Sequence, residues 1–144
     1  MRIVERPVTD AGLAALIDAA FGELVAKYGP EGRSAVHAEA RFLVAVVDDL
    51  AAGCGAVQPA EGTTGELKRM YVAPGHRGRG IARSLLKALE GLAAEMGYDR
   101  LRLATGFRQP EAIALYESAG YVATAPYGKY VGEPQVFCYA KDLR

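Results

Sequence analysis

Apolar residues recur along the chain at helical spacing. This spacing predicts helices over residues 13–25, 80–96 and 110–118, and Gly29-Pro30 ends the first of them. The middle helix has the clearest apolar stripe, which indicates that one of its faces is buried. Residues 31–40 fit either a short further helix or a loop. We therefore expect about four helices.

Runs of β-branched residues and alternating apolar positions predict the strands. The expected strands cover residues 2–6, 41–47, 50–58, 66–72, 100–104, a short stretch at 122, and 136–140. Residues 59–65 and 125–134 are interpreted as loops. Short turns make the early strands antiparallel, whereas an intervening helix makes the strands at 66–72 and 100–104 parallel with a right-handed crossover. The predicted fold is α/β (α+β), with a mixed, mostly antiparallel central sheet of about six to seven strands flanked by about four helices.

The composition is typical of a globular protein. The chain has 144 residues, of which 51% are hydrophobic and 24% charged, and this fits one domain over 1–144. The formal net charge is +0, so we expect no nucleic acid and no membrane among its partners. No apolar run approaches the roughly 20 residues that span a bilayer, and the N-terminus lacks a signal-peptide core. These features predict a cytoplasmic protein.

The cysteines and histidines do not form a metal-binding pattern. Cys54 and Cys138 each lie in an apolar, strand-like segment, which is typical of reduced, buried thiols. His37 and His76 stand alone, without the spacing of zinc ligands. We therefore expect no metal.

A glycine-rich stretch, His76-Arg77-Gly78-Arg79-Gly80-Ile81-Ala82, connects a predicted strand to the clearest helix. A helix N-terminus presents unpaired N–H groups and the positive end of the helix dipole. The glycines let the backbone approach a pyrophosphate, and the two arginines can add charge-assisted contacts. Arg83 stands where the dinucleotide fingerprint needs a small residue, and a P-loop's Gly-Lys-Ser/Thr is absent. A pyrophosphate-binding loop and a plain turn remain as alternatives.

The same stretch resembles the signature of a known family. Arg77-Gly78-Arg79-Gly80-Ile81-Ala82 is similar to the R/Q-x-x-G-x-G/A motif of the GNAT superfamily of acyl-CoA N-acyltransferases. The likeness extends back through residues 66–72, forward through 83–86, and to residues 111–121, which resemble the family's second motif. Together these segments cover roughly half of the chain. The resemblance implies a GNAT fold and an N-acetyltransferase with acetyl-CoA as its cosubstrate.

The resemblance also implies which residues bind the cosubstrate. Backbone groups at the end of the fourth strand, at Met70, Tyr71 and Val72, would pair with the pantetheine arm. The pyrophosphate would be held by the loop, at Arg77, Gly78, Arg79, Gly80, Ile81 and Ala82. Ser84 would add a hydroxyl contact, or be an exposed helical serine. Gln109 stands near the place of a family Asn that contacts pantetheine, and its amide offers the same donors and acceptors.

Two residues would carry the proton transfers. Tyr116 matches a family tyrosine near the CoA sulfur that acts as general acid, although a core tyrosine is the alternative. Glu66 stands where several family members place a catalytic Glu, and would take the amine proton directly or through water. Its alternatives are an exposed carboxylate or a ligand for a cationic substrate. Residues four apart on a regular strand share a face, so Glu66 is expected on the same face as Met70 unless a bulge intervenes. Backbone N–H groups around residues 70–72 would meet the oxyanion.

The sequence says least about which residues contact the acceptor substrate. Tyr28, Glu66, Tyr127 and Tyr130 are the candidate substrate contacts, because tyrosine combines apolar area with a polar tip. An ordinary surface turn is the alternative for residues 126–130. The leading hypothesis is acetylation of a primary amine on a small molecule. A peptide or protein amine, and a non-catalytic acyl-CoA-binding module, are the alternatives, and a homodimer is compatible with the resemblance.

Overall fold

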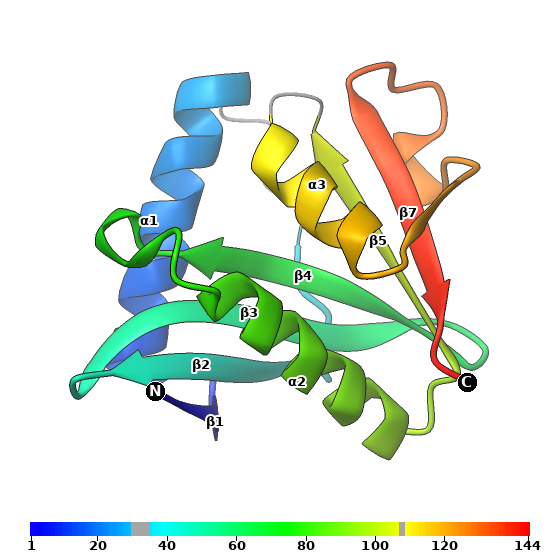
Figure 1. The fold of residues 1–144 in the computed structure, drawn as a ribbon. Coiled ribbons are helices and arrows are strands. Elements are labelled where there is room, and N and C mark those ends of the chain that lie inside the picture. Colours follow the sequence, from blue (N-terminus) through cyan, green and yellow to red (C-terminus); the bar gives the residue numbers. More distant parts are fainter. Residues whose placement is uncertain (30–34, 107–108) are drawn as a thin grey trace.

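The computed structural model describes residues 1–29, 35–106 and 109–144. Its elements follow the expected order (Figure 1): β1 (Arg2–Arg6), α1 (Ala11–Tyr28), β2 (Arg41–Val47), β3 (Leu50–Glu61), β4 (Thr64–Val72), η2 (Pro74–His76), α2 (Ile81–Glu95), β5 (Arg100–Gly106), α3 (Pro110–Ser118), β6 (Val122–Thr124), η3 (Gly128–Tyr130) and β7 (Val136–Asp142). Three α-helices lie in these described ranges. The stretch expected to be a helix or a loop at 31–40 is not helical at 35–40, and residues 30–34 lie outside the description. None of the described helices has the length and apolar character needed to cross a bilayer.

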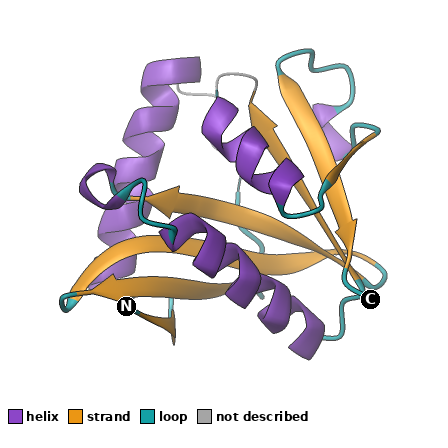
Figure 2. Ribbon diagram, viewed as in Figure 1, coloured by secondary structure: helices purple, strands orange, loops and turns teal. Residues whose placement is uncertain are grey.

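The sheet has seven strands in the order β1-β2-β3-β4-β5-β7-β6. Every neighbouring pair is antiparallel except β4 and β5, which are parallel. This confirms the predicted mixed, mostly antiparallel sheet. Helix α1 covers one face, while α2 and α3 lie on the other (Figure 2).

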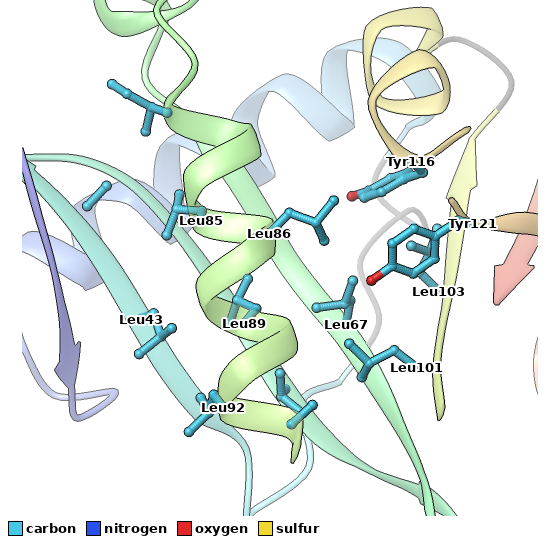
Figure 3. Close-up of a cluster of buried hydrophobic side chains, with 14 of the residues drawn as sticks. Leu43, Leu67, Leu85, Leu86, Leu89, Leu92, Leu101, Leu103, Tyr116 and Tyr121 are labelled. Carbon is cyan, nitrogen blue, oxygen red and sulfur yellow. The ribbon is translucent and has the colours of Figure 1, made fainter. Parts of the chain in front are cut away.

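Two apolar clusters fix the helices to the sheet. Leu85, Leu86 and Leu89 of α2 are at most 1% exposed and pack against Leu67 of β4 and Leu101 of β5 (Figure 3). On the other face, the cluster comprises Leu13, Leu16, Ile17, Phe42, Val44, Val46, Cys54 and Ala56. Because a fully buried leucine contributes roughly 1.5–3 kcal/mol, α2 is a firm base for the loop that precedes it.

The predicted loop at 59–65 is wrong, because β3 and β4 continue through it. β3 runs to Glu61, β4 begins at Thr64, and Gly62, with φ 57, lies in the tight turn between them. Proline is tolerated at position 59 because β3 pairs with β2 only as far as Val57.

A β-bulge in β4 changes which residues share a face. Cys54 and Ala56 of β3 are two residues apart, but their partners, Tyr71 and Lys68, are three apart. The irregularity includes Arg69, which has φ 59, a left-handed conformation that is uncommon outside glycine. Met70 therefore packs in the α2 cluster with Leu67. Met70 and Glu66 therefore lie on opposite faces, which is the bulge exception to the expected shared face, because the extra residue reverses the alternation.

The parallel strands β4 and β5 pair over only three residues each. Thr64–Glu66 face Arg100–Arg102, after which the strands diverge into a V (Figure 1). Beyond this vertex β5 stays paired with β7 as far as Gly106, while β4 keeps its pairing with β3. The backbone edges that face each other across the V are therefore not joined by a ladder.

Candidate active site

The glycine-rich loop leads into α2 with its backbone amides available. Gly78 has φ 78 and Gly80 has φ 80, which explains why these positions are glycine. Gly80 is the N-cap of α2, and no side chain caps the helix there. The first amides of α2, at Ile81 and Ala82, are thus left for an anion. Arg79 is exposed beside them.

The Arg77 side chain is held by the protein itself. Its Nε donates to the Val72 carbonyl at 2.8 Å, and its Nη2 donates to the Glu23 carboxylate at 2.8 and 3.0 Å. The Tyr71 hydroxyl donates to the same carboxylate at 2.7 Å. Burial opposes the charge on Glu23, but the hydrogen bonds from Tyr71 and Arg77 outweigh it and lower the Glu23 pKa. Glu23 thus ties α1 to the loop, a role that helical spacing alone did not indicate.

The end of β4 presents backbone groups to the V. The Ala73 N–H donates to Ala52 of β3 at 2.8 Å. Since backbone groups alternate sides along a strand, those of Val72 and Met70 point away from β3 and toward the V. These are among the residues expected to pair with pantetheine, and the Val72 carbonyl also accepts the Arg77 hydrogen bond.

Tyr116 lies on the α2 side of the sheet. Its side chain is 6% exposed and belongs to the cluster around Leu86, and its ring meets that of Tyr121 edge-on at 5.8 Å between centroids (Figure 3). Burial raises the pKa of the Tyr116 phenol to about 12, so it remains a proton donor at neutral pH.

Five polar side chains gather on the opposite face, where β4 and β5 begin to separate. We call Glu66, Lys68, Arg102, Tyr127 and Tyr130 the α1-face polar cluster. Glu66 is 6% exposed, and its carboxylate lies 3.2 Å from Lys68 Nζ and 3.5 Å from Arg102 Nε. Lys68 also donates to the Tyr130 hydroxyl at 3.2 Å, and the Arg102 guanidinium stacks 3.8 Å from the centre of the Tyr127 ring.

The structure thus brings three of the four predicted substrate residues into one cluster. Lys68 and Arg102 were missed as site residues. Period-two alternation along β4 puts Lys68 on the face of Glu66, whereas Arg102 lies beside Glu66 through the register between β4 and β5, which the sequence does not show. The Tyr127 hydroxyl is buried, and in the described part of the chain it has no hydrogen-bond partner. Burial, followed by the nearby charge of Glu66, raises the Tyr127 pKa far above its usual range.

The other predicted site residues lie around the V. Tyr28, at the end of α1, packs its hydroxyl against Gly106 so closely that a Cβ there would clash. Gln109 is half-buried before α3, where its side chain caps nothing and its N–H donates to Gly106 at 3.2 Å. Ser84 is half-buried in the first turn of α2.

Both cysteines are free and buried, as predicted. The Cys54 thiol donates to the Arg69 carbonyl at 3.3 Å, at the bulge. Burial raises the pKa of Cys54 to about 12, which makes this thiol a poor nucleophile.

A family model decides the classification. The model described as the acetyltransferase (GNAT) family matches residues 13–121, about three quarters of the chain. The chain belongs to the GNAT family. It is an acetyl-CoA-dependent N-acetyltransferase, and its seven-stranded sheet and helices are the GNAT fold.

Individual GNAT proteins are similar over most of the chain. An IAA acetyltransferase of Azospirillum brasilense is 41% identical over 104 residues, which cover 72% of this chain and 68% of that protein. A Klebsiella pneumoniae structure described as an acyl-CoA N-acyltransferase is 34% identical, with a TM-score of 0.84 over 99% of this chain and 97% of the other. A Bacillus subtilis acetyltransferase in complex with CoA shares the fold, with 17% identity and a TM-score of 0.77 over 99% of each chain.

Proposed function

We propose that this GNAT enzyme moves the acetyl group of acetyl-CoA to a primary amine of a small molecule by direct attack. The observation that carries the proposal is the position of Glu66, a buried carboxylate at the vertex where β4 and β5 separate. A carboxylate there can meet an amine that approaches the V from the α1 face.

In this proposal the cosubstrate lies along the V. Its pyrophosphate binds the amides of residues 77–82, which the glycine conformations and the uncapped helix start support. The pantetheine arm follows the β4 edge past Val72 and Met70 toward the vertex, as a peptide adds to a free sheet edge. Ser84 and Gln109 contribute contacts from α2 and from the start of α3.

The reaction needs one proton acceptor and one proton donor. The amine nitrogen attacks the thioester carbonyl, the C–N bond forms, the C–S bond breaks, and the electron pair leaves with sulfur. Glu66 takes the amine proton directly or through water, and Tyr116 protonates the thiolate. Backbone N–H groups at residues 70–72 stabilise the oxyanion. The location of Glu66 and Tyr116 on opposite faces of the sheet suits attack from one side and departure toward the other.

The acceptor binds on the α1 face, between Tyr28 and the α1-face polar cluster. A small acceptor is supported by the relative named for acetylating IAA rather than a protein. The alternatives, a peptide or protein amine and a non-catalytic acyl-CoA-binding module, remain outcomes of the test below.

The test pairs an amine panel with the substitution Glu66→Gln. The panel contains small primary amines, peptides with free N-termini and a lysine-containing protein, and turnover is followed by release of CoA. Turnover of small amines supports the proposal, whereas turnover of only peptides or protein favours the first alternative. Tight binding of acetyl-CoA with no acetylated amine favours the module.

The Glu66→Gln variant distinguishes a base from a ligand. Loss of a base lowers kcat roughly 10²-fold at neutral pH, with partial recovery at higher pH as more amine is deprotonated. Loss of a ligand instead raises the acceptor KM and spares kcat. Glu61→Gln is the control, because Glu61 also approaches Arg102, at 3.7 Å, but its side chain is 85% exposed. An unchanged Glu66→Gln enzyme would remove Glu66 from the mechanism.

A further inference from the structure

Arg102 is a half-buried cation whose contacts with carboxylates are long. Its side chain is 22% exposed, and it lies 3.5 Å from Glu66 and 3.7 Å from the exposed Glu61. Charge-assisted N–H···O bonds are usually about 2.7–2.9 Å long, so neither contact is a strong hydrogen bond. A guanidinium carries five N–H donors, and most of those of Arg102 are therefore still available.

The Arg102 guanidinium lies over the Tyr127 ring. Stacking at 3.8 Å restricts the rotation of the guanidinium, which reduces the entropy lost when it binds a planar anion. The Tyr127 hydroxyl adds a buried donor that, in the described ranges, bonds to no protein group. An unsatisfied buried hydroxyl is costly, and a bound acceptor would relieve that cost.

The charges of Glu66 and Arg102 complement a zwitterion. Glu66 presents a negative charge where the proposed amine attacks, and Arg102 faces it directly across the two strands. We infer that the acceptor is a small amino acid, whose carboxylate binds Arg102 while its amine faces Glu66. This inference rests on the proposed function and specifies its substrate class. The short distance between the two side chains requires the amine and the carboxylate to be a few bonds apart.

The first experiment uses the wild-type enzyme and matched substrates. The protein amino acids that carry a primary amine are compared with the corresponding amines that lack the carboxylate, so that each pair shares its side chain. Because the α-amino group of an amino acid is less basic than the matching amine, kcat/KM is expressed per unprotonated amine. For accepted pairs, kcat/KM should be about 10- to 100-fold higher for the amino acid, from a charge-assisted pair with an arginine. Equal or higher kcat/KM for the amines would overturn the inference and leave the proposed function intact. No turnover of any amine would overturn both.

The second experiment removes the cation. Arg102→Met should bring the ratio of kcat/KM between amino acid and amine close to one, while the acetyl-CoA dissociation constant stays unchanged. A purely structural role for Arg102 would lower both rates equally and preserve the ratio, which would contradict the inference. Arg100→Gln is the control, because Arg100 lies two residues earlier on the same face of β5 and pairs with the exposed Asp142. This control should keep the wild-type ratio.

Discussion

Glu66 and Arg102 are the last residues that face each other across β4 and β5 before the two strands separate. Upstream of this pair the sheet is continuous, and beyond it the V opens. A carboxylate and a guanidinium at the vertex can contact a molecule in the V while their backbones stay fixed in a ladder. This position combines rigidity with access, which a reacting group requires.

Tyr116→Phe tests the proposed acid. The substitution removes only the hydroxyl, and the ring can keep its packing against Tyr121. We expect kcat to fall roughly 10²-fold or more, with little change in the CoA dissociation constant. Steady-state kinetics and calorimetry measure the two quantities. Unchanged turnover in single-turnover experiments, where product release does not limit the rate, would exclude Tyr116 as the acid.

The pH dependence of kcat offers an independent check on Tyr116. An acid must be protonated to act, so its activity is lost as the pH rises through its pKa. Because burial raises that pKa to about 12, Tyr116 should produce no fall in kcat between about pH 7 and pH 10. A fall within this window that disappears in Tyr116→Phe would contradict the raised pKa.

Gly80→Val tests the cofactor loop. Gly80 has φ 80, a conformation that costs a residue with a Cβ about 1–2 kcal/mol. The altered helix start should raise the CoA dissociation constant by at least about tenfold, as measured by calorimetry. Gly91→Ala is the matched control, because Gly91 lies in α2 with open space around it and without a positive φ. Equal affinities in the two variants would show that the loop is not the cofactor site.

Glu23→Ala tests how the loop is anchored. The substitution removes the acceptor of Arg77 Nη2 and of the Tyr71 hydroxyl, so that Arg77 is held only through Val72 and the loop becomes less ordered. Because this ion pair is partly exposed, we expect the acetyl-CoA KM to rise by no more than about fivefold. Glu23→Gln keeps an acceptor oxygen and should show a smaller rise. A lower KM would mean that released Arg77 binds the anion better than the anchored loop does.

Gly55→Ala and Leu89→Ala test the packing of α2 against the sheet. A Cβ at Gly55 would lie 2.5 Å from Leu89 Cδ1 and 2.6 Å from Met70 Sδ. Alone, Gly55→Ala should lower the free energy of unfolding by about 1–3 kcal/mol through overpacking, and Leu89→Ala by about 2–5 kcal/mol through a cavity. The double variant should lose less than the sum, because the added methyl enters the vacated space. Denaturant unfolding measures all three, and strict additivity would argue against the contact.

The sequence pattern predicts the fold well where side chains alternate or recur regularly. The apolar stripe of α2 and the strand at 41–47 are found nearly as expected, because burial on one face sets the period of apolar residues. The pattern fails at Pro59, since a polar, proline-containing stretch does not disclose that its strand has lost one neighbour. It fails again at Arg69, because an arginine gives no sign of the bulge.

The candidate site is predictable only where it depends on local backbone geometry. Gly78 and Gly80 reveal the loop because positive φ selects glycine. The roles of Glu23 and Arg102 cannot be predicted from the sequence, since their partners lie on other elements, 54 and 36 residues away along the chain. A charged residue on a helix or strand has the same sequence signature whether it faces water or another charge.

The bulge residue Arg69 is not required by either of the two apolar clusters. In a chain without Arg69, Met70 would directly follow Lys68 and would still lie on the α2 side with Leu67. Tyr71 would still face α1. Both apolar clusters would thus be preserved by a one-residue deletion. The left-handed conformation of Arg69 costs about 1 kcal/mol or more. The bulge instead sets the backbone directly before Met70 and Val72, whose groups face the V.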